Sequence, residues 1–488
     1  MPGSAVTPVI VGVAQLEQRI QEYTEGKEPA DLMIDALRAA AEDCGNPGVL
    51  DAAGSVRVIR GIWPYKNPAR YVADALGLGS VETALSPYGG NYVQTTTNLS
   101  CLDIQSGAHD VILITGAECG NTQAKARRAG TRKEWMKLPG TPDRLLGDDK
   151  PMNHEVEAAA GIRAPIQFYP MFETALRHAL GHGVEEHQAH IARLWAGFSA
   201  VAADNPHAWI RSPVSAEEIA TPSASNRPVS FPYPKFMNSN NNVDQAAALI
   251  VCSTDKARAL GIPESKWVYP HAGTDATDHL YVSHRDTLFE SPAIRFAGRR
   301  VLELAGVTAD DLKHIDVYSC FPVAVQVAAR ELGLSLERPL TVTGGLTFAG
   351  GPLNNYVMHS IARTVELLRE DADAKALVTA NGGYLTKHAF GVYSATPPAH
   401  PFQHEDLQAQ VDAELKRDVV KDASGTATVE GYAVMYGAKG PEIAHVAARL
   451  PGGERCWANC RDTDTLNAMI ANEFCGRDVH IKDGAAAF

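Results

Sequence analysis

Short apolar runs alternate with amphipathic stretches along most of the chain, and this alternation predicts a layered α/β protein. Residues 9–14 read as the first buried strand, and Pro29 opens a helix whose apolar positions recur at roughly helical spacing. The same pattern returns later, where a helix over 293–305 precedes a strand over 315–318. We therefore expect helices to cover sheets in both halves of the chain.

Two segments repeat one pattern, which is a Gly-Gly turn, a helix and a buried strand. In the first, Gly89-Gly90 precedes the strand 111–116; in the second, Gly350-Gly351 precedes the strand 376–380. A glycine turn lets backbone N–H groups approach a ligand, and a helix N-terminus favours negative charge. The duplication therefore predicts one active site that faces two equivalent helix starts.

The composition and the pattern of predicted elements change at two places along the chain. Residues from about 121 to 230 are polar with two helices, near 166–182 and 184–203, which predicts a lid inserted over a site. After the prolines near 398, short strand-like runs and a helix near 463–472 predict a small β-barrel. The predicted organisation is an N-terminal half over 1–120 plus 231–270, a lid over 121–230, a C-terminal half over 271–397 and a barrel domain over 398–488.

Composition narrows the class of protein. The 488 residues are 45% hydrophobic and 21% charged, which is ordinary for a soluble protein of several domains. The net charge of −13 argues against broad nucleic-acid binding. No apolar run is long enough for a membrane span, and the N-terminus lacks the pattern of a signal peptide. Eight scattered cysteines fit reduced thiols. We expect a cytoplasmic protein.

The order of these parts resembles the thiolase superfamily, and most of all the sterol-carrier-protein-type thiolases and type-1 thiolase-like proteins. The resemblance covers roughly residues 5–395 and includes the two Gly-Gly elements. It rests also on three motifs: Asn205-Pro206-His207-Ala208-Trp209, Thr115-Gly116-Ala117-Glu118, and the strand from Asp244 to Val251 with Gln245 in place of a glycine. It implies a duplicated, five-layer αβαβα fold with a helical lid and a C-terminal domain similar to an oligonucleotide-binding (OB) barrel.

The resemblance also shows which thiolase residues this chain lacks. Gly90 stands where thiolases carry the nucleophilic cysteine, and Gly351 replaces the histidine that activates it. Asn381 replaces the second, acid/base cysteine, and Tyr318 replaces the oxyanion-binding Asn or His. Because a thiolate is needed to form an acyl-enzyme, we do not expect ordinary thiolase activity.

Polar residues still follow the strands and turns of the expected site. Tyr and His serve as acids or bases, and Asn can hold an oxyanion. His388 lies in a glycine-bounded loop, whereas Cys320 reads more readily as a packed thiol, and His359 fits either the site or a helix face. The candidate catalytic residues are His388, Tyr318, Cys320, His359, Asn354 and Asn381.

The expected ligand is coenzyme A (CoA) or an acyl-CoA, as substrate or bound molecule, with no permanently bound cofactor and no metal. In thiolases the lid binds the phosphates of CoA, which suggests a binding role for the basic lid residues, although solvated surface is the commoner place for such residues. The basic candidates are Arg127, Arg128, Arg132 and Lys133. Cys456, Cys460, Cys475 and His480 form only a weak zinc pattern.

Three functions remain open on these residues. The first is a thiolase-like protein that binds CoA or acyl-CoA and is related to the acetyl-CoA acetyltransferases of lipid metabolism. The second is a retro-aldol carbon–carbon lyase that acts on an acyl-CoA without a covalent intermediate. The third is non-catalytic binding, of acyl-CoA or of nucleic acid through the barrel, whose sequence has no basic stripe interleaved with aromatics. Pro87, Gly89 and Gly90 weaken the strand edge through which thiolases dimerise, so we expect a monomer rather than a dimer.

Overall fold

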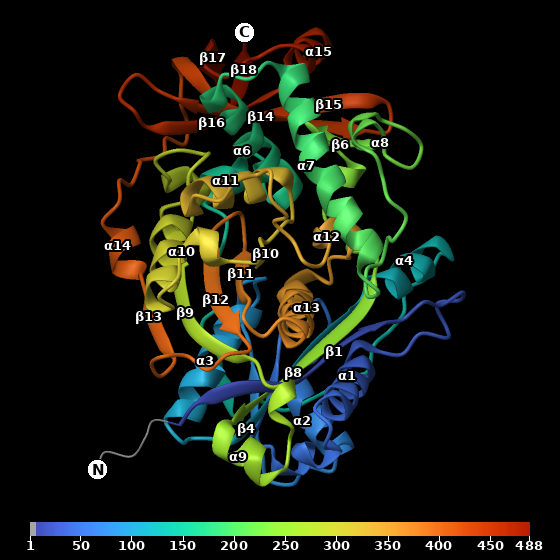
Figure 1. Ribbon diagram of the computed structural model, residues 1–488. Coiled ribbons are helices and arrows are strands. Elements are labelled where there is room, and N and C mark those ends of the chain that lie inside the picture. Colours follow the sequence, from blue (N-terminus) through green and yellow to red (C-terminus); the bar gives the residue numbers. More distant parts are fainter. Residues whose placement is uncertain (1–5) are drawn as a thin grey trace.

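A computed structural model describes residues 6–488 as two stacked mixed sheets with a helical lid and a barrel at one end (Figure 1). The first sheet has the spatial order β1-β8-β4-β2-β3-β5. Its central strands β4 and β8 are antiparallel and buried along their whole length. The strands are β1 (Pro8–Glu17), β2 (Ser55–Val58), β3 (Glu82–Leu85), β4 (Val111–Cys119), β5 (Arg144–Leu145) and β8 (Asp244–Ser253).

The second sheet has the order β10-β11-β12-β9-β13. The chain does not leave this sheet after the prolines near 398, because β13 pairs in parallel with β9 and forms the edge of the sheet before the barrel begins. The strands are β9 (Tyr269–Thr277), β10 (His314–Asp316), β11 (Lys375–Gly382), β12 (Lys387–Ser394) and β13 (Gln403–Asp406).

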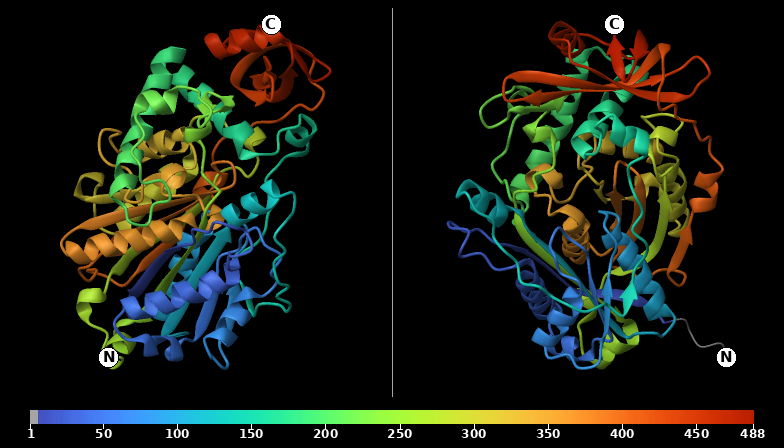
Figure 2. Two further views of the ribbon diagram at one scale, coloured as in Figure 1. Left: turned by 90° about the vertical axis from the view of Figure 1, so that its right-hand side faces the viewer. Right: turned by 180° about the vertical axis from the view of Figure 1, so that it is seen from behind.

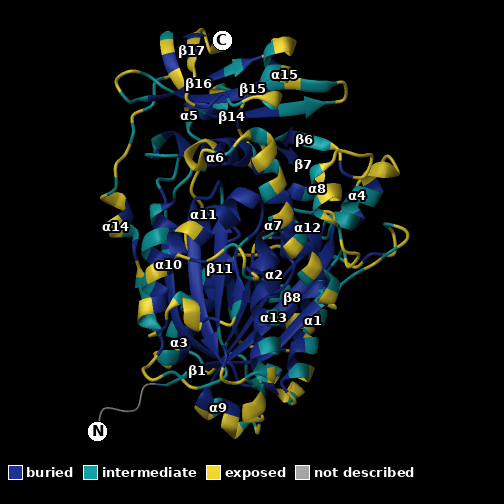
Figure 3. Ribbon diagram, turned by 45° about the horizontal axis from the view of Figure 1, so that its top comes forward, coloured by how far each residue is buried: buried dark blue, intermediate teal, exposed yellow. Residues whose placement is uncertain are grey.

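Two helices lie between the sheets and contact both of them. These are α3 (Tyr92–Gln105) and α13 (Tyr356–Glu370), the helices that follow the two Gly-Gly turns. Outer helices α1 (Pro29–Asp43) and α2 (Pro68–Ala75) cover the first sheet, while α10 (Pro292–Leu304) covers the second and carries α11 (Pro322–Leu332). The predicted five-layer αβαβα fold is thereby confirmed, and dark blue marks its buried centre in Figure 3.

The lid contains the two helices that the sequence predicts, α6 (Pro165–Leu180) and α7 (Val184–Asp204). They lie between the sheets and the barrel in Figure 1. Shorter helices complete the chain: α4 (Gly120–Arg128), α5 (Glu155–Ala159), α8 (Ala216–Ala220), α9 (Thr254–Ala259), α12 (Gly345–Phe348) and α14 (Gln408–Asp412).

The C-terminal domain is a closed five-stranded barrel in which β14 pairs with both β15 and β17. The residues on both sides of Gly431 form a single strand, β14, with a bulge between Val429 and Gly431. A side chain at Gly431 would put its Cβ 2.7 Å from the Met171 carbonyl oxygen of α6, so glycine permits the close approach of lid and barrel. The barrel elements are β14 (Gly425–Gly437), β15 (Gly440–Arg449), β16 (Arg455–Cys460), α15 (Thr463–Ala471), β17 (Asp478–Lys482) and β18 (Ala485–Ala487).

The lid also joins the barrel through strands. β6 (Pro228–Phe231) pairs with β14, and β7 (Tyr233–Pro234) pairs with β6. Figure 2 shows the barrel seated on the lid side of the molecule, at the end opposite the first sheet. The barrel is therefore continuous with the lid by hydrogen bonding as well as by packing.

A buried ion cluster ties the barrel to the second half of the core. Arg455 is fully buried, and its guanidinium donates to Glu430 at 2.7 Å. Its Nη1 also donates to the carbonyl oxygens of Val282, Ser283 and Arg285 at 2.9, 3.1 and 2.6 Å. Burial raises the pKa of Glu430, but the neighbouring arginines outweigh burial and leave that pKa below its ordinary value.

Candidate functional site

The first Gly-Gly turn lies against the end of β11, so residues from the two halves of the chain meet there. A Cβ placed on Gly90 would lie 2.4 Å from the backbone oxygen of Asn381 and 2.6 Å from the hydroxyl oxygen of Tyr318. Both distances are far below van der Waals contact. The nucleophile position is therefore not only without a thiol but filled by its neighbours.

The second Gly-Gly turn is held by three side-chain amides. Gly350 has φ +109°, and a Cβ there would lie 2.3 Å from Gln245 Oε1. Gln245 Nε2 donates to the Ala349 carbonyl at 2.9 Å, so the Gln that replaces a thiolase glycine fixes this turn. Asn354 and Asn355 donate to the carbonyl oxygens of Arg60 and Gly116 at 2.7 and 2.8 Å. Asn354 thus anchors the turn to the first half of the chain.

Tyr318, Cys320 and Asn381 come together below the first turn. Asn381 Nδ2 donates to the hydroxyl of Tyr169 at 3.0 Å and lies 3.8 Å from the Cys320 sulfur. Burial raises the pKa of Cys320 to about 12, which makes it a neutral packed thiol at physiological pH. Burial also raises the pKa of Tyr318 well above its ordinary value. Tyr169 of α6 also belongs to this cluster, but no motif in the sequence predicted that it would.

His388 lines the same small cavity as Tyr318 and Asn381, but the cavity has only about 10 Å³. That is space for one water molecule at most. The His388 Nε2 lies 3.4 Å from Asp278 Oδ2, and Asp278 also accepts from the backbone N–H of Ala293 at the start of α10. His388 is therefore half of a buried pair that also caps a helix.

His359 lies apart from this cluster. It points from α13 to β1, where its Nδ1 lies 3.2 Å from Gln15 Oε1. Burial lowers the pKa of His359 to about 3, so its ring is neutral. Of the six candidate catalytic residues, the structure gathers Tyr318, Cys320, Asn381 and His388, and it places Asn354 and His359 elsewhere.

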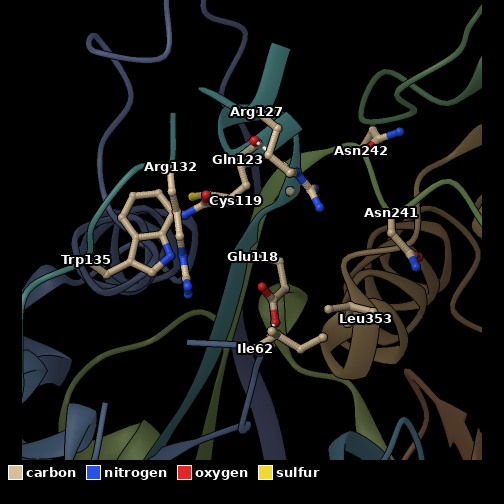
Figure 4. Close-up of a pocket in the computed structure, with 11 residues that line it drawn as sticks. Ile62, Glu118, Cys119, Gln123, Arg127, Arg132, Trp135, Asn241, Asn242 and Leu353 are labelled. Carbon is tan, nitrogen blue, oxygen red and sulfur yellow. Dashed lines mark hydrogen bonds between the residues drawn. The ribbon is translucent and has the colours of Figure 1, made fainter. Parts of the chain in front are cut away.

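A larger pocket of about 450 Å³ opens beside the second Gly-Gly turn. We call it the Glu118 pocket, and Figure 4 shows its side chains. Leu353, two residues after Gly351, is part of its wall, and the wall residue Asn241 lies next to Gly351. The lining residues are Ile62, Glu118, Cys119, Gly120, Gln123, Arg127, Arg132, Trp135, Asn241, Asn242 and Leu353.

Two of the four basic lid candidates, Arg127 and Arg132, line this pocket, whereas Arg128 and Lys133 do not. Both lining guanidinium groups are exposed, and neither has a carboxylate at ion-pair distance among residues 6–488. Such groups are free to bind an anion. The sequence identified these two arginines, but not Glu118, Trp135 or the two asparagines that share the pocket with them.

Comparison with known proteins assigns the family. Residues 406–485 match the sequence model of the additional C-terminal domain of thiolase-like protein type 1. A monomeric SCP2-thiolase-like protein type 1 from Mycobacterium smegmatis has 32% sequence identity and a TM-score of 0.85, over 99% of each chain. The chain belongs to the SCP2-thiolase-like proteins of type 1.

More distant similarities place this thiolase-like chain near the acetyl-CoA acetyltransferases. An acetyl-CoA acetyltransferase from Methanothermobacter thermautotrophicus is 24% identical over 395 residues, which cover 76% of this chain and 94% of that protein. The Ltp2-ChsH2(DUF35) aldolase shares the fold at 20% identity and a TM-score of 0.60, over 80% of this chain and 97% of its own. The acetyl-CoA acetyltransferase from Syntrophomonas wolfei does so at 18% identity and a TM-score of 0.57, over 81% and 100%.

Other features of the thiolase-like chain concern metals and membranes. Within residues 6–488, no group of three His, Cys, Asp or Glu side chains is arranged to hold a metal ion. Cys456 and Cys460 lie on β16, and all eight cysteines are buried and unpaired by disulfides. Across the same residues, none of the helices is both long and apolar enough to cross a bilayer.

Proposed function

We propose that this thiolase-like protein binds a CoA thioester in the Glu118 pocket without forming an acyl-enzyme. The observation that carries the proposal is the contrast between two neighbouring places. The nucleophile position at Gly90 is filled by Tyr318 and Asn381, whereas an open pocket with two unpaired arginines lies beside the second Gly-Gly turn. The likeness to acetyl-CoA acetyltransferases supports the choice of CoA.

The dimensions and chemistry of the pocket suit one end of such a ligand. A volume of about 450 Å³ lies within the range of small-molecule sites, which is ~300–1,000 Å³. Arg127 and Arg132 are exposed and fit the phosphates of CoA, which carry negative charge. The apolar Leu353 and the amide of Asn241 line the pocket next to the Gly351 turn, where a pantetheine arm would end.

Binding of CoA is expected to depend on the two arginines that line the pocket. Arg127→Ala and Arg132→Ala should each weaken the binding of acetyl-CoA by about 10- to 150-fold, since a hydrogen bond to a charged group contributes roughly 1.5–3 kcal/mol. Isothermal titration calorimetry measures this. Arg128→Ala is the matched control, because Arg128 lies on the same helix α4 but does not line the pocket. Equal losses in all three variants would indicate general charge attraction and would contradict this binding mode.

A carbon–carbon lyase acting on an acyl-CoA is the second candidate. It is favoured by the position of the Tyr318 hydroxyl, which stands where a thiolase nucleophile would be, and by the shared fold of the aldolase. The cavity of about 10 Å³ beside Tyr318 gives a substrate no room, so binding is the stronger proposal. Turnover of a 3-hydroxyacyl-CoA to a shorter product that is lost in Tyr318→Phe and His388→Gln would favour the lyase. No turnover in the wild type would exclude it for that substrate.

We also propose that the protein is a monomer. β5 pairs with β3 at Ala84 and Leu85 and so covers the outer edge of the first sheet, through which thiolases dimerise. The monomeric relative from Mycobacterium smegmatis supports this state. Sedimentation velocity at micromolar concentration should show a single species with the mass of one chain. A dimer that persists on dilution would contradict the role of β5.

A further inference from the structure

Glu118 is the one carboxyl group among the residues that line the Glu118 pocket, and neighbouring residues leave space for it. It is the next-to-last residue of β4, the strand that leads directly into α4, and it is 6% exposed. A Cβ on Gly61 would lie 2.3 Å from Glu118 Oε1, so glycine at position 61 leaves the space that the carboxyl group occupies. The adjacent Trp63 donates its indole N–H to the Ala117 carbonyl at 3.2 Å.

The Glu118 carboxyl group has one hydrogen-bond donor among the described residues. The backbone N–H of Ile62 donates to Oε1 at 2.7 Å. No lysine, arginine or histidine of residues 6–488 forms an ion pair with it, and its second oxygen has no hydrogen-bond partner in that part of the chain. A carboxyl group that is nine-tenths buried without a cation is unusual in a structural role, because burial of an unpaired charge is costly.

Burial raises the pKa of Glu118 to about 8, against the opposing effect of the Ile62 N–H. The carboxyl group is therefore mostly protonated at pH 7, and its second oxygen can donate a hydrogen bond. A protonated acid beside two arginines is suited to an anionic ligand that also carries a carbonyl acceptor. In Figure 4 the carboxyl group lies beside the side chains of Ile62 and Leu353, with Arg132 to its left and Arg127 above it.

We infer that Glu118 binds the ligand as a neutral acid, by donating a hydrogen bond to its thioester carbonyl oxygen, and that binding is thereby linked to uptake of a proton. This inference rests on the proposed function, since it assigns a role to one residue of the same pocket. Gly90, Gly351 and Asn381 stand at the positions of the thiolase catalytic residues, and none of them has a carboxyl group that could donate a proton, whereas Glu118 does.

The other charged and titratable groups around Glu118 do not account for such a linkage. Tyr88 faces it from the loop after β3, and burial raises the pKa of Tyr88. Cys119 follows it in the chain, and burial, with nearby carboxylates including Asp244, raises the pKa of that thiol well above its ordinary value. Arg60 from the loop after β2 is paired with Asp149, and the other charged side chains of the wall are Arg127 and Arg132. Asn241, Asn242 and Leu353 do not titrate.

The inference is tested by calorimetry with acetyl-CoA in buffers that differ in ionisation enthalpy. The wild type should take up about half a proton on binding at pH 8, and its affinity should fall about tenfold between pH 7 and pH 9, as only the protonated form binds. Glu118→Gln keeps a donor and cannot ionise. It should lose the part of the proton uptake and pH dependence that belongs to Glu118.

Three other results would decide against the inference in distinguishable ways. If the wild type does not bind acetyl-CoA at pH 7, the proposed function and this inference both fail. If the wild type binds but Glu118→Gln shows the same proton uptake and pH dependence, only the inference fails. If Glu118→Gln does not fold, the absence of proton uptake by the wild type at pH 8 still overturns it. Unfolding curves at pH 7 establish which case applies.

Discussion

Gly90→Cys is expected to lower the free energy of unfolding by about 3 kcal/mol and to yield no thiolase activity. The introduced Cβ would lie 2.4 Å from the backbone oxygen of Asn381, which cannot rotate away, and 2.6 Å from the Tyr318 hydroxyl. The strand end and the tyrosine must both shift to admit it. The variant would also lack an activating base, because Gly351 stands at the position of the thiolase histidine.

Urea denaturation measures the loss of stability, and thiolysis of acetoacetyl-CoA measures activity. Gly197→Cys is the matched control. Gly197 is exposed on α7, and a Cβ there would meet no heavy atom within 4 Å apart from neighbouring backbone of its own helix, so the change there should stay within about 1 kcal/mol. A Gly90→Cys protein with wild-type stability that becomes acylated by acetyl-CoA would show that the nucleophile position is open.

Arg455→Met is expected to cost about 3–5 kcal/mol of stability, because it leaves Glu430 buried with a single partner and removes one hydrogen-bond donor from each of three carbonyl oxygens. Met preserves much of the volume and the unbranched shape of the side chain, so the loss reports on charge and hydrogen bonding. Since these contacts join the barrel to the core, barrel amides should lose more protection from hydrogen exchange than amides of the first sheet.

The control is Arg70→Met. Arg70 forms an exposed ion pair with Asp74 on α2 and donates to the carbonyl oxygens of Leu78 and Gly79, so it tests the loss of an arginine from the surface, at a cost of about 1–2 kcal/mol. The same cluster around Arg455 also predicts how the stability of the protein changes with pH. The pKa of Glu430 is lowered in the folded protein, so its stabilisation is present above the ordinary glutamate pKa and is lost as the pH falls through the lowered value. A cost for Arg455→Met equal to that of Arg70→Met would contradict a central role of the cluster in docking the barrel.

Local patterns were sufficient to predict the layers of the fold but not the contents of the site. The strand 9–14 and the helices near 166–182 and 184–203 were predictable because apolar periodicity reports burial directly. The strand β5 has two residues and no such periodicity, so its cover over β3 could not be foreseen. Gly431 reads as a strand break in the sequence, but β14 continues through it beside a bulge, and α6 packs closely against this glycine.

In the candidate site, too, the sequence predicted some features and only the packing of the structure revealed the others. A motif comparison reveals that a cysteine is missing at Gly90, but only packing shows that Tyr318 and Asn381 fill the space. The basic run after β4 predicted Arg127, Arg128, Arg132 and Lys133 alike, and sequence could not show that only Arg127 and Arg132 line the pocket. Glu118 belongs to a motif that the sequence shares with the family, but nothing in the sequence indicated that its carboxyl group would be buried without a basic partner.

The decisive measurement is a crystal structure of the protein with acetyl-CoA. We expect phosphate oxygens at hydrogen-bond distance from Arg127 or Arg132, an intact thioester whose carbonyl oxygen lies beside Glu118, and no group attached to the protein. Acetyl-CoA bound elsewhere, or an acetyl group attached to Cys320 or another side chain near Gly90, would contradict this expectation.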